Sequence, residues 1–346
     1  MRHLVTIQKV TNIEPIEGAD RIVSAKVQGW PVVILKGVFN EGALVAYYEV
    51  DTLLPVDDPR YKNFASRGTK TIVVEGGGEV TGHVLRTMRM RGVLSQGLVL
   101  PLQEAGLTTE QIAAAQEGQD ITKEAGVFKY EEPAIASTGG LIVGNFDTRF
   151  APKSDAERVQ TLTKYWNEIV HLDWIPTVKA DGSSHTFVND DGSVRMFSRN
   201  KELSTQSTTY TLAEQIGLVA ILLDHPGMAI QAELVGPGIQ KNRLKLRRNN
   251  LLVFAVYQHG VKVPREQWDT RLEALAVPAL DDEWRPHGTV DEMIEKVATL
   301  TGNITKGCRD EGVVFHLAEG QEIPSWMDRN SNFKIINNTY LLKHKI

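Results

Sequence analysis

Short apolar runs separated by turn-forming residues fill residues 1–103 of the chain. Pro15 to Asp20 and Asn40-Glu-Gly42 are two of the turn signals, and the runs between such turns alternate apolar with polar positions. Because successive side chains of a strand point to opposite faces, this period of two is typical of half-buried β-strands. The pattern predicts an all-β barrel or sandwich with strands over residues 4–10, 22–27, 32–35, 44–48, 71–74, 82–88 and 97–100.

The rest of the chain mixes helical and strand-like patterns. A short capped helix is expected near residues 107–115, and residues 124–140 have the composition of a linker. Ser154 and Glu157 have capping-box spacing, and apolar residues follow at helical intervals as far as Ile169, so a helix is expected there. Further helices are expected over residues 209–223 and 290–300, and strands over residues 175–178, 185–188, 194–200, 231–236, 251–257, 310–315 and 332–336.

These patterns predict an α+β protein with two domains. The length of 346 residues is sufficient for two separate cores, since a domain usually holds roughly 100 to 200 residues. We expect an all-β domain over residues 1–130, a linker over residues 131–150 and a second domain over residues 151–346.

The charge of the chain limits how it could bind nucleic acid. Its formal net charge is −5, so binding would depend on a local basic patch rather than on the overall field. Lys241, Arg243, Lys245 and Arg247 form such a patch. If this segment is a strand, the last three of these side chains share one face, which is compatible with phosphate contacts and equally with a solvated strand face.

Neither the apolar runs of the chain nor its N-terminal sequence indicates a membrane span or secretion. No apolar run reaches the roughly 20 residues that a membrane-spanning helix needs, and the N-terminus continues into strand-like sequence without a secretory apolar region. Cys308 is the single cysteine and cannot form an internal disulfide. The sequence therefore predicts a cytoplasmic protein.

Candidate chemistry centres on Lys179. A β-prone run over residues 175–178 brings this lysine to a tight turn at Asp181-Gly182, so that an amine lies beside a carboxylate at a strand end. The motif Lys-x-Asp-Gly is weak evidence by itself, because a surface hairpin with an exposed lysine could have the same sequence. Support has to come from other segments.

The lysine motif resembles that of the covalent nucleotidyltransferases, which comprise ATP-dependent RNA and DNA ligases and mRNA-capping guanylyltransferases. Further segments resemble their other motifs in the same order along the chain: Ser198-Arg199-Asn200, Glu233, Phe254, Glu311-Gly312 and Lys334. Segments near residues 16–22, 48–51 and 91–97 resemble the OB domain at the N-terminus of one class of RNA ligase. The chain is thus similar to the ATP-dependent RNA ligases of the type 5 class.

The resemblance implies an OB-fold barrel followed by an ATP-grasp-like ligase domain of antiparallel sheets flanked by helices. It implies that Lys179 attacks the α-phosphate of ATP to form lysyl-AMP, that Lys334 contacts this phosphate, and that Asp181 orients the lysine or a metal-bound water. Val178, Arg199, Glu233 and Phe254 would bind the nucleotide. Glu233 and Glu311 would bind Mg²⁺ or Mn²⁺, for which carboxylate oxygens are suitable ligands.

RNA is the partner that the resemblance implies. The AMP would pass to an RNA 5′-phosphate, which is then sealed to a 3′-hydroxyl, and we expect a monomer acting on nicked duplex. The expected RNA contacts are Arg86, Arg89, Arg91, Asn200, Lys241, Arg243, Lys245 and Arg247.

Three alternatives remain open at this stage. A capping guanylyltransferase or a DNA ligase would share the lysine motif, although these families usually continue into a further OB domain after the position of Lys334. A non-catalytic OB-fold protein that binds nucleic acid is the third. The final motif often has a second lysine two residues away, but Asn332 and Ile336 occupy those positions, so that role would be absent or taken by Lys343 or Lys345.

Overall fold

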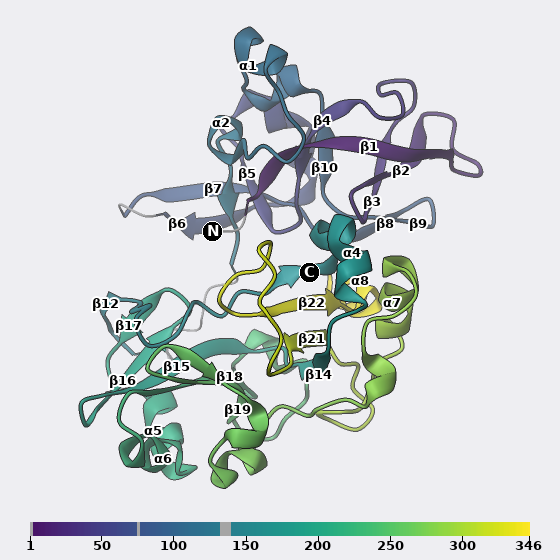
Figure 1. Ribbon diagram of the computed structural model, residues 1–346. Helices are drawn as coiled ribbons and strands as arrows, with labels where there is room; N and C mark the ends of the chain where they lie inside the picture. The colour runs from purple at the N-terminus through teal and green to yellow at the C-terminus, as the bar shows by residue number, and fades with distance from the viewer. Residues whose placement is uncertain (1–2, 75–76, 132–139) are drawn as a thin grey trace. The chain divides into compact units, whose positions relative to one another are not determined.

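The computed structural model describes residues 3–74, 77–131 and 140–346 and divides them into two compact units (Figure 1). The first unit holds the described residues up to 131 together with Gln160–Lys164 and Leu341–Ile346. The second holds residues 140–159 and Tyr165–Tyr340. Among the described residues, no helix is both long enough and apolar enough to cross a membrane.

Antiparallel sheets make up most of the first unit. One sheet has the order β10-β4-β1-β2-β3 and another the order β11-β5-β7-β6, and β8 and β9 form a hairpin. Strand β1 pairs with β4 through residues 5–9 and with β2 through residues 10–15, so one long strand belongs to two consecutive pairings. The strands are β1 (Val5–Pro15), β2 (Ile22–Val27), β3 (Trp30–Leu35), β4 (Leu44–Tyr48), β5 (Thr52–Pro55), β6 (Lys70–Val73), β7 (Glu79–Val84), β8 (Met88–Met90), β9 (Val93–Ser95), β10 (Leu98–Leu100) and β11 (Phe128–Lys129).

The alternation read from the sequence matches the burial of these strands. Residues of β2 and β3 alternate between buried and partly exposed positions, as expected for strands with one face on a core. The short capped helix is also confirmed as α1 (Thr109–Ala113), where Thr108 accepts a hydrogen bond from the Gln111 amide and the Gln111 side chain accepts one from the Thr108 amide. Strand β5 had no predicted counterpart.

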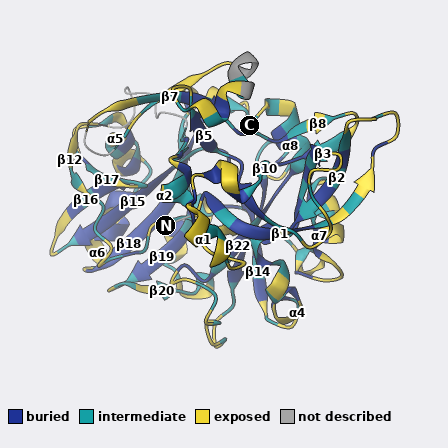
Figure 2. Cartoon of the chain, turned by 90° about the horizontal axis from the view of Figure 1, so that it is seen from above, coloured by how far each residue is buried: buried dark blue, intermediate teal, exposed yellow. Residues whose placement is uncertain are grey.

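Two sheets form the centre of the second unit. The larger has the order β12-β17-β16-β15-β18-β19-β20 and the smaller the order β13-β22-β21-β14. Figure 2 shows buried residues along β15, β18 and β19. The strands are β12 (Ile142–Asn145), β13 (Glu157–Arg158), β14 (Trp174–Lys179), β15 (Ser183–Asp190), β16 (Ser193–Ser198), β17 (Lys201–Leu203), β18 (Met228–Val235), β19 (Asn250–Gln258), β20 (Val261–Val263), β21 (Gly312–Leu317) and β22 (Asn332–Ile336).

Helices α5 (Thr208–Gln215) and α6 (Leu218–Asp224) cover one face of the larger sheet (Figure 1). Their apolar residues pack with Ile230, Ala232 and Leu234, which are the alternate residues of β18 that point toward the helices. Since neighbouring positions of a strand point to opposite faces, Gln231 and Glu233 lie on the other face. The remaining α-helices of the described chain are α2 (Thr122–Ala125), α4 (Trp166–Ile169), α7 (Val290–Val297) and α8 (Asn338–His344).

Two predictions about the chain's elements were wrong. The expected helix starting at Ser154 is instead extended chain and β13, followed by a 3₁₀ helix (Val159–Tyr165) and α4, because Glu157 pairs with Phe333 of β22. The expected helix over 209–223 is divided at Gly217, which has a φ of 82°.

The predicted linker over residues 131–150 also differs from the structure. Residues 132–139 lie outside the described residues, and residues 142–145 form β12, which pairs with β17 in the larger sheet. The segment 124–140, which had the composition of a linker, contains the end of α2 and the strand β11, and β11 pairs with β5. The pairing partners of both short strands are far away in sequence, so local composition could not reveal them.

Candidate active site

The side chain of Lys179 forms an ion pair at the end of β14. Its Nζ lies 2.6 Å from Oε2 of Glu311, the residue that directly precedes β21. The two side chains are 25% and 13% exposed, respectively. Strand pairing brings them together, because Lys179 lies opposite Gly312. The structure thus joins the lysine motif to an acid 132 positions further along the chain.

Two glycines allow this arrangement. A Cβ atom at Gly182 would lie 2.3 Å from the carbonyl oxygen of Leu234 and 2.7 Å from Cγ of Glu233. A Cβ atom at Gly312 would lie 2.2 Å from the carbonyl oxygen of Ile335. These distances are too short for any side chain, so the glycines of the Lys-x-Asp-Gly and Glu-Gly motifs are required for the close approach of neighbouring backbones.

Asp181 is held from two sides. Nη1 of Arg243 lies 3.0 Å from Oδ2 of Asp181, and the Tyr340 hydroxyl donates a hydrogen bond of 2.6 Å to the same oxygen. The side chains of Arg243 and Asp181 are only 5% and 8% exposed. A buried carboxylate with a cation and a hydroxyl donor is fixed in place. This supports the predicted orienting role of Asp181 beside Lys179.

The basic segment differs from its prediction. Residues 241–248 form no strand, and backbone φ angles are positive at Lys241 and Lys245. Lys241, Lys245 and Arg247 are exposed, whereas Arg243 points inward to Asp181. The expectation that Arg243 shares an exposed face with Lys245 and Arg247 was therefore wrong, because the buried carboxylate of Asp181 binds this arginine.

Glu233 completes the acidic surroundings of the lysine. Burial raises the pKa of Glu233 to about 7, against the opposing charges of Lys179 and Arg199. Among the described residues, no cation lies within ion-pair distance of its carboxylate. Burial alone would lower the pKa of Lys179, but the carboxylates of Glu311, Glu233 and Asp181 outweigh it and raise this pKa. We refer to these four residues as the lysine site.

The register of the smaller sheet places three more residues on the lysine's face. Thr177 lies opposite Val314, and Val314 lies opposite Lys334. Directly opposed residues of antiparallel strands point to the same side, and Thr177 is two positions from Lys179. The charge of Lys334 also stabilises the Glu311 carboxylate. Thr177, Val314 and Lys334 therefore lie on the same face as Lys179.

Val178 does not share this face. Its side chain is 1% exposed, and its amide donates to the carbonyl of Pro278 at 2.9 Å. The stacked rings of Phe315 and Phe333, with centroids 4.7 Å apart, occupy the same buried side of the sheet. Strand alternation turns the side chain of Val178 into the core, and its expected contact with the nucleotide stays a prediction.

Phe254 and Arg199 lie on the larger sheet. The pairing of β18 with β19 shifts between Gln231 and Ala232, which leaves Phe254 as the extra residue of a β-bulge. Phe254 is partly buried against Ala255 and Tyr257 and so lies on the side of Glu233, away from α5 and α6. Arg199 Nη1 is 3.6 Å from Oδ1 of Asp155. Both residues are compatible with the predicted nucleotide contacts.

Four further residues are expected to contact RNA, and three of them belong to the first unit. The Arg86 guanidinium lies 5.5 Å from the centroid of the Tyr130 ring, and Arg89 donates a hydrogen bond of 2.8 Å to the Gly92 carbonyl. These residues and Arg91 belong to the first unit, as do Lys343 and Lys345. Asn200 is exposed at the end of β16. Their roles toward RNA stay predictions.

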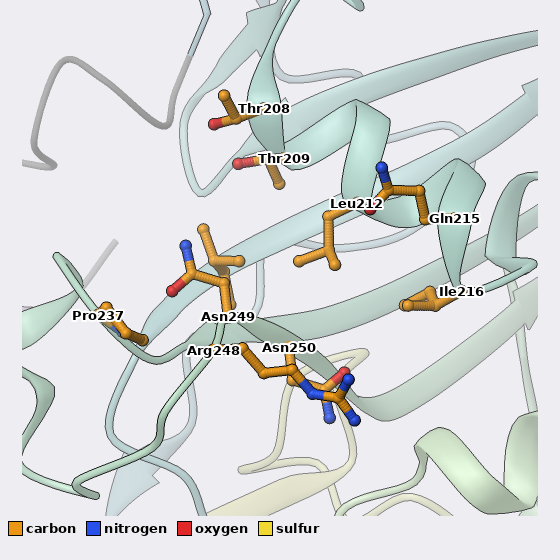
Figure 3. A pocket seen from close by; sticks show the side chains of 10 residues that line it. Thr208, Thr209, Leu212, Gln215, Ile216, Pro237, Arg248, Asn249 and Asn250 are labelled. Carbon is orange, nitrogen blue, oxygen red and sulfur yellow. The ribbon is translucent and has the colours of Figure 1, made fainter.

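One cavity of about 650 Å³ lies on the helix-covered side of the larger sheet (Figure 3). It is bounded by one side of α5, by Leu234 and by residues 248–250 at the start of β19. Leu234 points to the side opposite Glu233, so this cavity is separate from the lysine site.

Sequence reasoning missed Tyr340 and the partner of Asp181. Tyr340 lies on α8, and its amide donates to Oδ1 of Asn337 at 3.1 Å, which positions the ring close to the lysine turn. Its only signal in the sequence was its place just after the strand of Lys334. Asp310, next to Glu311, was also missed: it is fully buried and accepts hydrogen bonds from the amide and side chain of Asn303.

Comparisons with known proteins agree with this site. The family described as RNA ligase matches residues 172–335, and an OB-fold domain family matches residues 4–102. The chain is similar to solved structures of Naegleria gruberi RNA ligase. A mutant apo form has 32% identity and a TM-score of 0.85, with 99% of this chain and 98% of that chain covered. The chain belongs to the RNA ligase family.

Two further structures of the Naegleria gruberi enzyme are also similar. A mutant with AMP and Mn has 32% identity and a TM-score of 0.84, and covers 99% of both chains. A mutant with ATP and Mn has 32% identity and a TM-score of 0.82, and 99% of this chain and 98% of that chain are covered. No curated protein matches the chain. The prediction of an RNA ligase with an N-terminal OB domain followed by a nucleotidyltransferase domain is confirmed, which favours this family over DNA ligases and capping enzymes.

The lysine site also fits a divalent cation of the Mg²⁺ type. Within the described residues, no group of three or more His, Cys, Asp or Glu side chains could hold a metal ion by itself. Glu233 and Glu311 supply carboxylates next to the lysine, and Arg243 and Tyr340 engage Asp181. Mg²⁺ is usually bound by one or two carboxylates together with substrate phosphates and water. The donor set of the site matches this rule.

Replacement of Arg243 should impair the lysine site, while replacement of the exposed Arg247 should not. Arg243→Met leaves the buried Asp181 carboxylate without its cation, and the loss of one member of a buried ion pair costs about 3–5 kcal/mol. We expect lower thermal stability and a loss of at least about 10-fold in the rate of covalent nucleotide attachment, measured without RNA. Arg247→Met is the matched control. Equal rates in the two variants would contradict the inward role of Arg243.

The stability of the protein should depend on pH through Glu233. Its folded-state pKa of about 7 lies above the ordinary 4.5, so its contribution to stability is fully present below pH 4.5 and is lost as the pH rises through 7. In EDTA, wild type should lose stability relative to Glu233→Gln over this range, by at most about 3 kcal/mol. Urea unfolding at several pH values measures the difference, with the exposed Glu266→Gln as control. A difference that does not change with pH would contradict the burial of an unpaired carboxylate.

Proposed function

We propose that this RNA ligase seals RNA through a lysyl-AMP intermediate on Lys179, with ATP and Mg²⁺ or Mn²⁺. The observation that carries the proposal is the Lys179 amine among the carboxylates of Glu311, Glu233 and Asp181. A structural lysine needs one partner, whereas this amine is surrounded by an excess of acids that suits a cation and a phosphate chain. The similar Naegleria gruberi structures contain ATP or AMP with Mn, which supports the choice of nucleotide and metal.

The reaction consists of three displacements at phosphorus. In the first, Nζ of Lys179 attacks the α-phosphorus of ATP, a P–N bond forms, and the bond to the β-phosphate oxygen breaks to release pyrophosphate. In the second, an oxygen of the RNA 5′-phosphate attacks the same phosphorus and the lysine amine leaves. In the third, the RNA 3′-hydroxyl loses its proton and attacks the 5′-phosphate, and AMP leaves.

The lysine must lose a proton before it attacks, and the carboxylates around it oppose this loss. A lysine with a pKa near 10.4 already needs about 4–5 kcal/mol to be neutral at pH 7. The surrounding carboxylates raise the pKa of Lys179 further. A divalent cation held by Glu233 and Glu311 would supply positive charge at these carboxylates and lower the cost of deprotonation. Lys334, on the same face, would add positive charge near the α-phosphate.

The remaining roles follow from position. Asp181, fixed by Arg243 and Tyr340, orients the turn that carries Lys179. Phe254 would stack on the nucleobase from the larger sheet, and Arg199 would contact the nucleotide or the RNA end. These assignments rest on the shared faces of the two sheets described above.

For RNA binding we propose the exposed cations of the second unit and the OB-fold domain of the first. Lys241, Lys245 and Arg247 are exposed on a loop that continues to Arg243 at the lysine site. Arg86, Arg89, Arg91 and Asn200 are kept as further contacts. We propose nicked duplex RNA with a 5′-phosphate and a 3′-hydroxyl as substrate, a monomeric enzyme, and a cytoplasmic location consistent with the single free cysteine, Cys308.

Covalent labelling tests the proposal directly. The purified protein is incubated with α-labelled ATP or α-labelled GTP and Mg²⁺ or Mn²⁺, and label is measured on the denatured protein. We expect label from ATP that is absent in Lys179→Ala, since Lys179 supplies the amine that is labelled. Label from GTP in place of ATP would indicate a guanylyltransferase, and no label from either nucleotide would favour a non-catalytic protein that binds nucleic acid.

A further inference from the structure

The cavity between α5 and the start of β19 has two walls of different chemistry. Figure 3 shows α5 on one side of the cavity and residues 248–250 on the other. Leu212 and Ile216 give the wall of α5 an apolar surface, and Leu234 of β18 adds to it. The volume of about 650 Å³ lies in the range of about 300–1,000 Å³ that is usual for small-molecule sites. The reaction described above uses none of these residues.

The wall opposite α5 is polar and contains a hydrogen-bond acceptor without a partner. Oδ1 of Asn249 is buried, and no described residue donates a hydrogen bond to it. A buried acceptor without a donor is costly, so an N–H group of a ligand would be stabilised at this oxygen. Arg248 brings a positive charge to the same wall, and the described residues that line the cavity include no acid. The wall therefore suits a ligand that has N–H groups and a negative charge.

The cavity lies at the base of the basic loop that was described above. Residues 236–249 connect β18 to β19, and Pro237 and Arg248, near the two ends of this loop, line the cavity. Arg243, in the middle of the same loop, binds Asp181 at the lysine site. The exposed cations that follow Arg243 in sequence thus lead along the loop to Arg248. An RNA strand that follows these cations would pass from the lysine site to the cavity.

We propose that this cavity binds one unpaired nucleotide of the RNA strand whose 5′-phosphate enters the lysine site. The inference rests on the proposed function, because that 5′-phosphate reacts with the nucleotide on Lys179. The apolar side chains of α5 contact the base, and Asn249 Oδ1 accepts a hydrogen bond from one of its N–H groups. Arg248 binds a phosphate of the strand.

Recognition of an unpaired base has a consequence for duplex substrates. Proteins read RNA mainly through single-stranded bases that are turned out of the stack. Taking a base out of a duplex costs free energy, and the cost is least where the base is mismatched. RNA that is mismatched next to its 5′-phosphate should therefore bind more tightly than the same RNA with full pairing.

The test measures dissociation constants by fluorescence anisotropy, in EDTA and without ATP so that no RNA is sealed. The probes are two nicked RNA duplexes, one fully paired and one mismatched over the first four nucleotides after the 5′-phosphate. We expect wild type to bind the mismatched RNA at least about fivefold more tightly. Leu212→Trp, which fills the cavity, and Asn249→Ala, which removes the acceptor, should each reduce this ratio to less than about twofold.

Thr211→Trp is the matched control, because Thr211 lies on the exposed side of α5 and outside the cavity, and it should leave the ratio unchanged. Thermal unfolding and labelling by ATP without RNA check that each variant is folded and keeps its lysine site. Equal binding of the two RNAs by wild type, or a ratio that the cavity variants retain, would overturn the inference alone. If wild type binds neither RNA, the proposed RNA contacts and the inference are both wrong.

Cross-linking identifies the occupant of the cavity. With 4-thiouridine at each mismatched position in turn, at least one RNA should cross-link to a peptide that contains residues 208–216 or 248–250, and Leu212→Trp should abolish this product. Cross-links to other peptides only would contradict the inference. Cross-linking of these peptides by free 4-thiouridine 5′-monophosphate but by none of the RNAs would indicate a site for a free nucleotide and would also overturn it.

Discussion

The amine of Lys179 among three carboxylates is the interaction on which the second unit depends. It requires β14 to end beside Glu311, β18 to bring Glu233 to the same place, and the turn at Asp181 to be held by Arg243 and Tyr340. Gly182 and Gly312 lie where neighbouring backbone atoms leave no room for a side chain. Packing, turn geometry and charge together therefore determine the position of the Lys179 amine.

The charges of the lysine site are suited to binding a cation and a nucleotide. With Arg243 bound to Asp181, the Lys179 ammonium faces Glu311 directly and Glu233 at longer range. Burial is the main cause of the raised pKa of Glu233, whereas the neighbouring carboxylates raise the pKa of Lys179 against the effect of burial. A cation and the phosphates of a nucleotide would replace these protons. In this account, the cation that binds with the nucleotide also lowers the pKa of Lys179 and so activates its amine.

Much of the site could be predicted because its chemistry depends on local motifs carried by strands. Lys179, Glu233 and Glu311 each lie on or beside a strand expected from the alternation of apolar residues, and their order along the chain matched a known family. Contacts between distant residues could not be predicted. Arg243 looked like a member of an exposed basic strand, and only the fold shows that the buried Asp181 binds it.

The failures in secondary structure have the same origin. The capping-box spacing after Ser154 occurs in a segment that is extended because Glu157 pairs with Phe333, which lies 176 positions further along the chain. Val178 is next to the reacting lysine in sequence, yet strand alternation buries its side chain on the opposite face. Phe254 reaches the Glu233 side of its sheet at a β-bulge, which no pattern of alternation could have located.

The central claim is that the acidic surroundings hold Lys179 protonated until a cation arrives. Its most direct test is the pKa of the Lys179 amine, followed by NMR of a ¹³C-methylated lysine assigned with Lys179→Arg, in EDTA and in Mg²⁺. The account predicts a pKa above the ordinary 10.5 in EDTA and a decrease when Mg²⁺ binds. A pKa already below 10.5 in EDTA, or one that Mg²⁺ leaves unchanged, would contradict it.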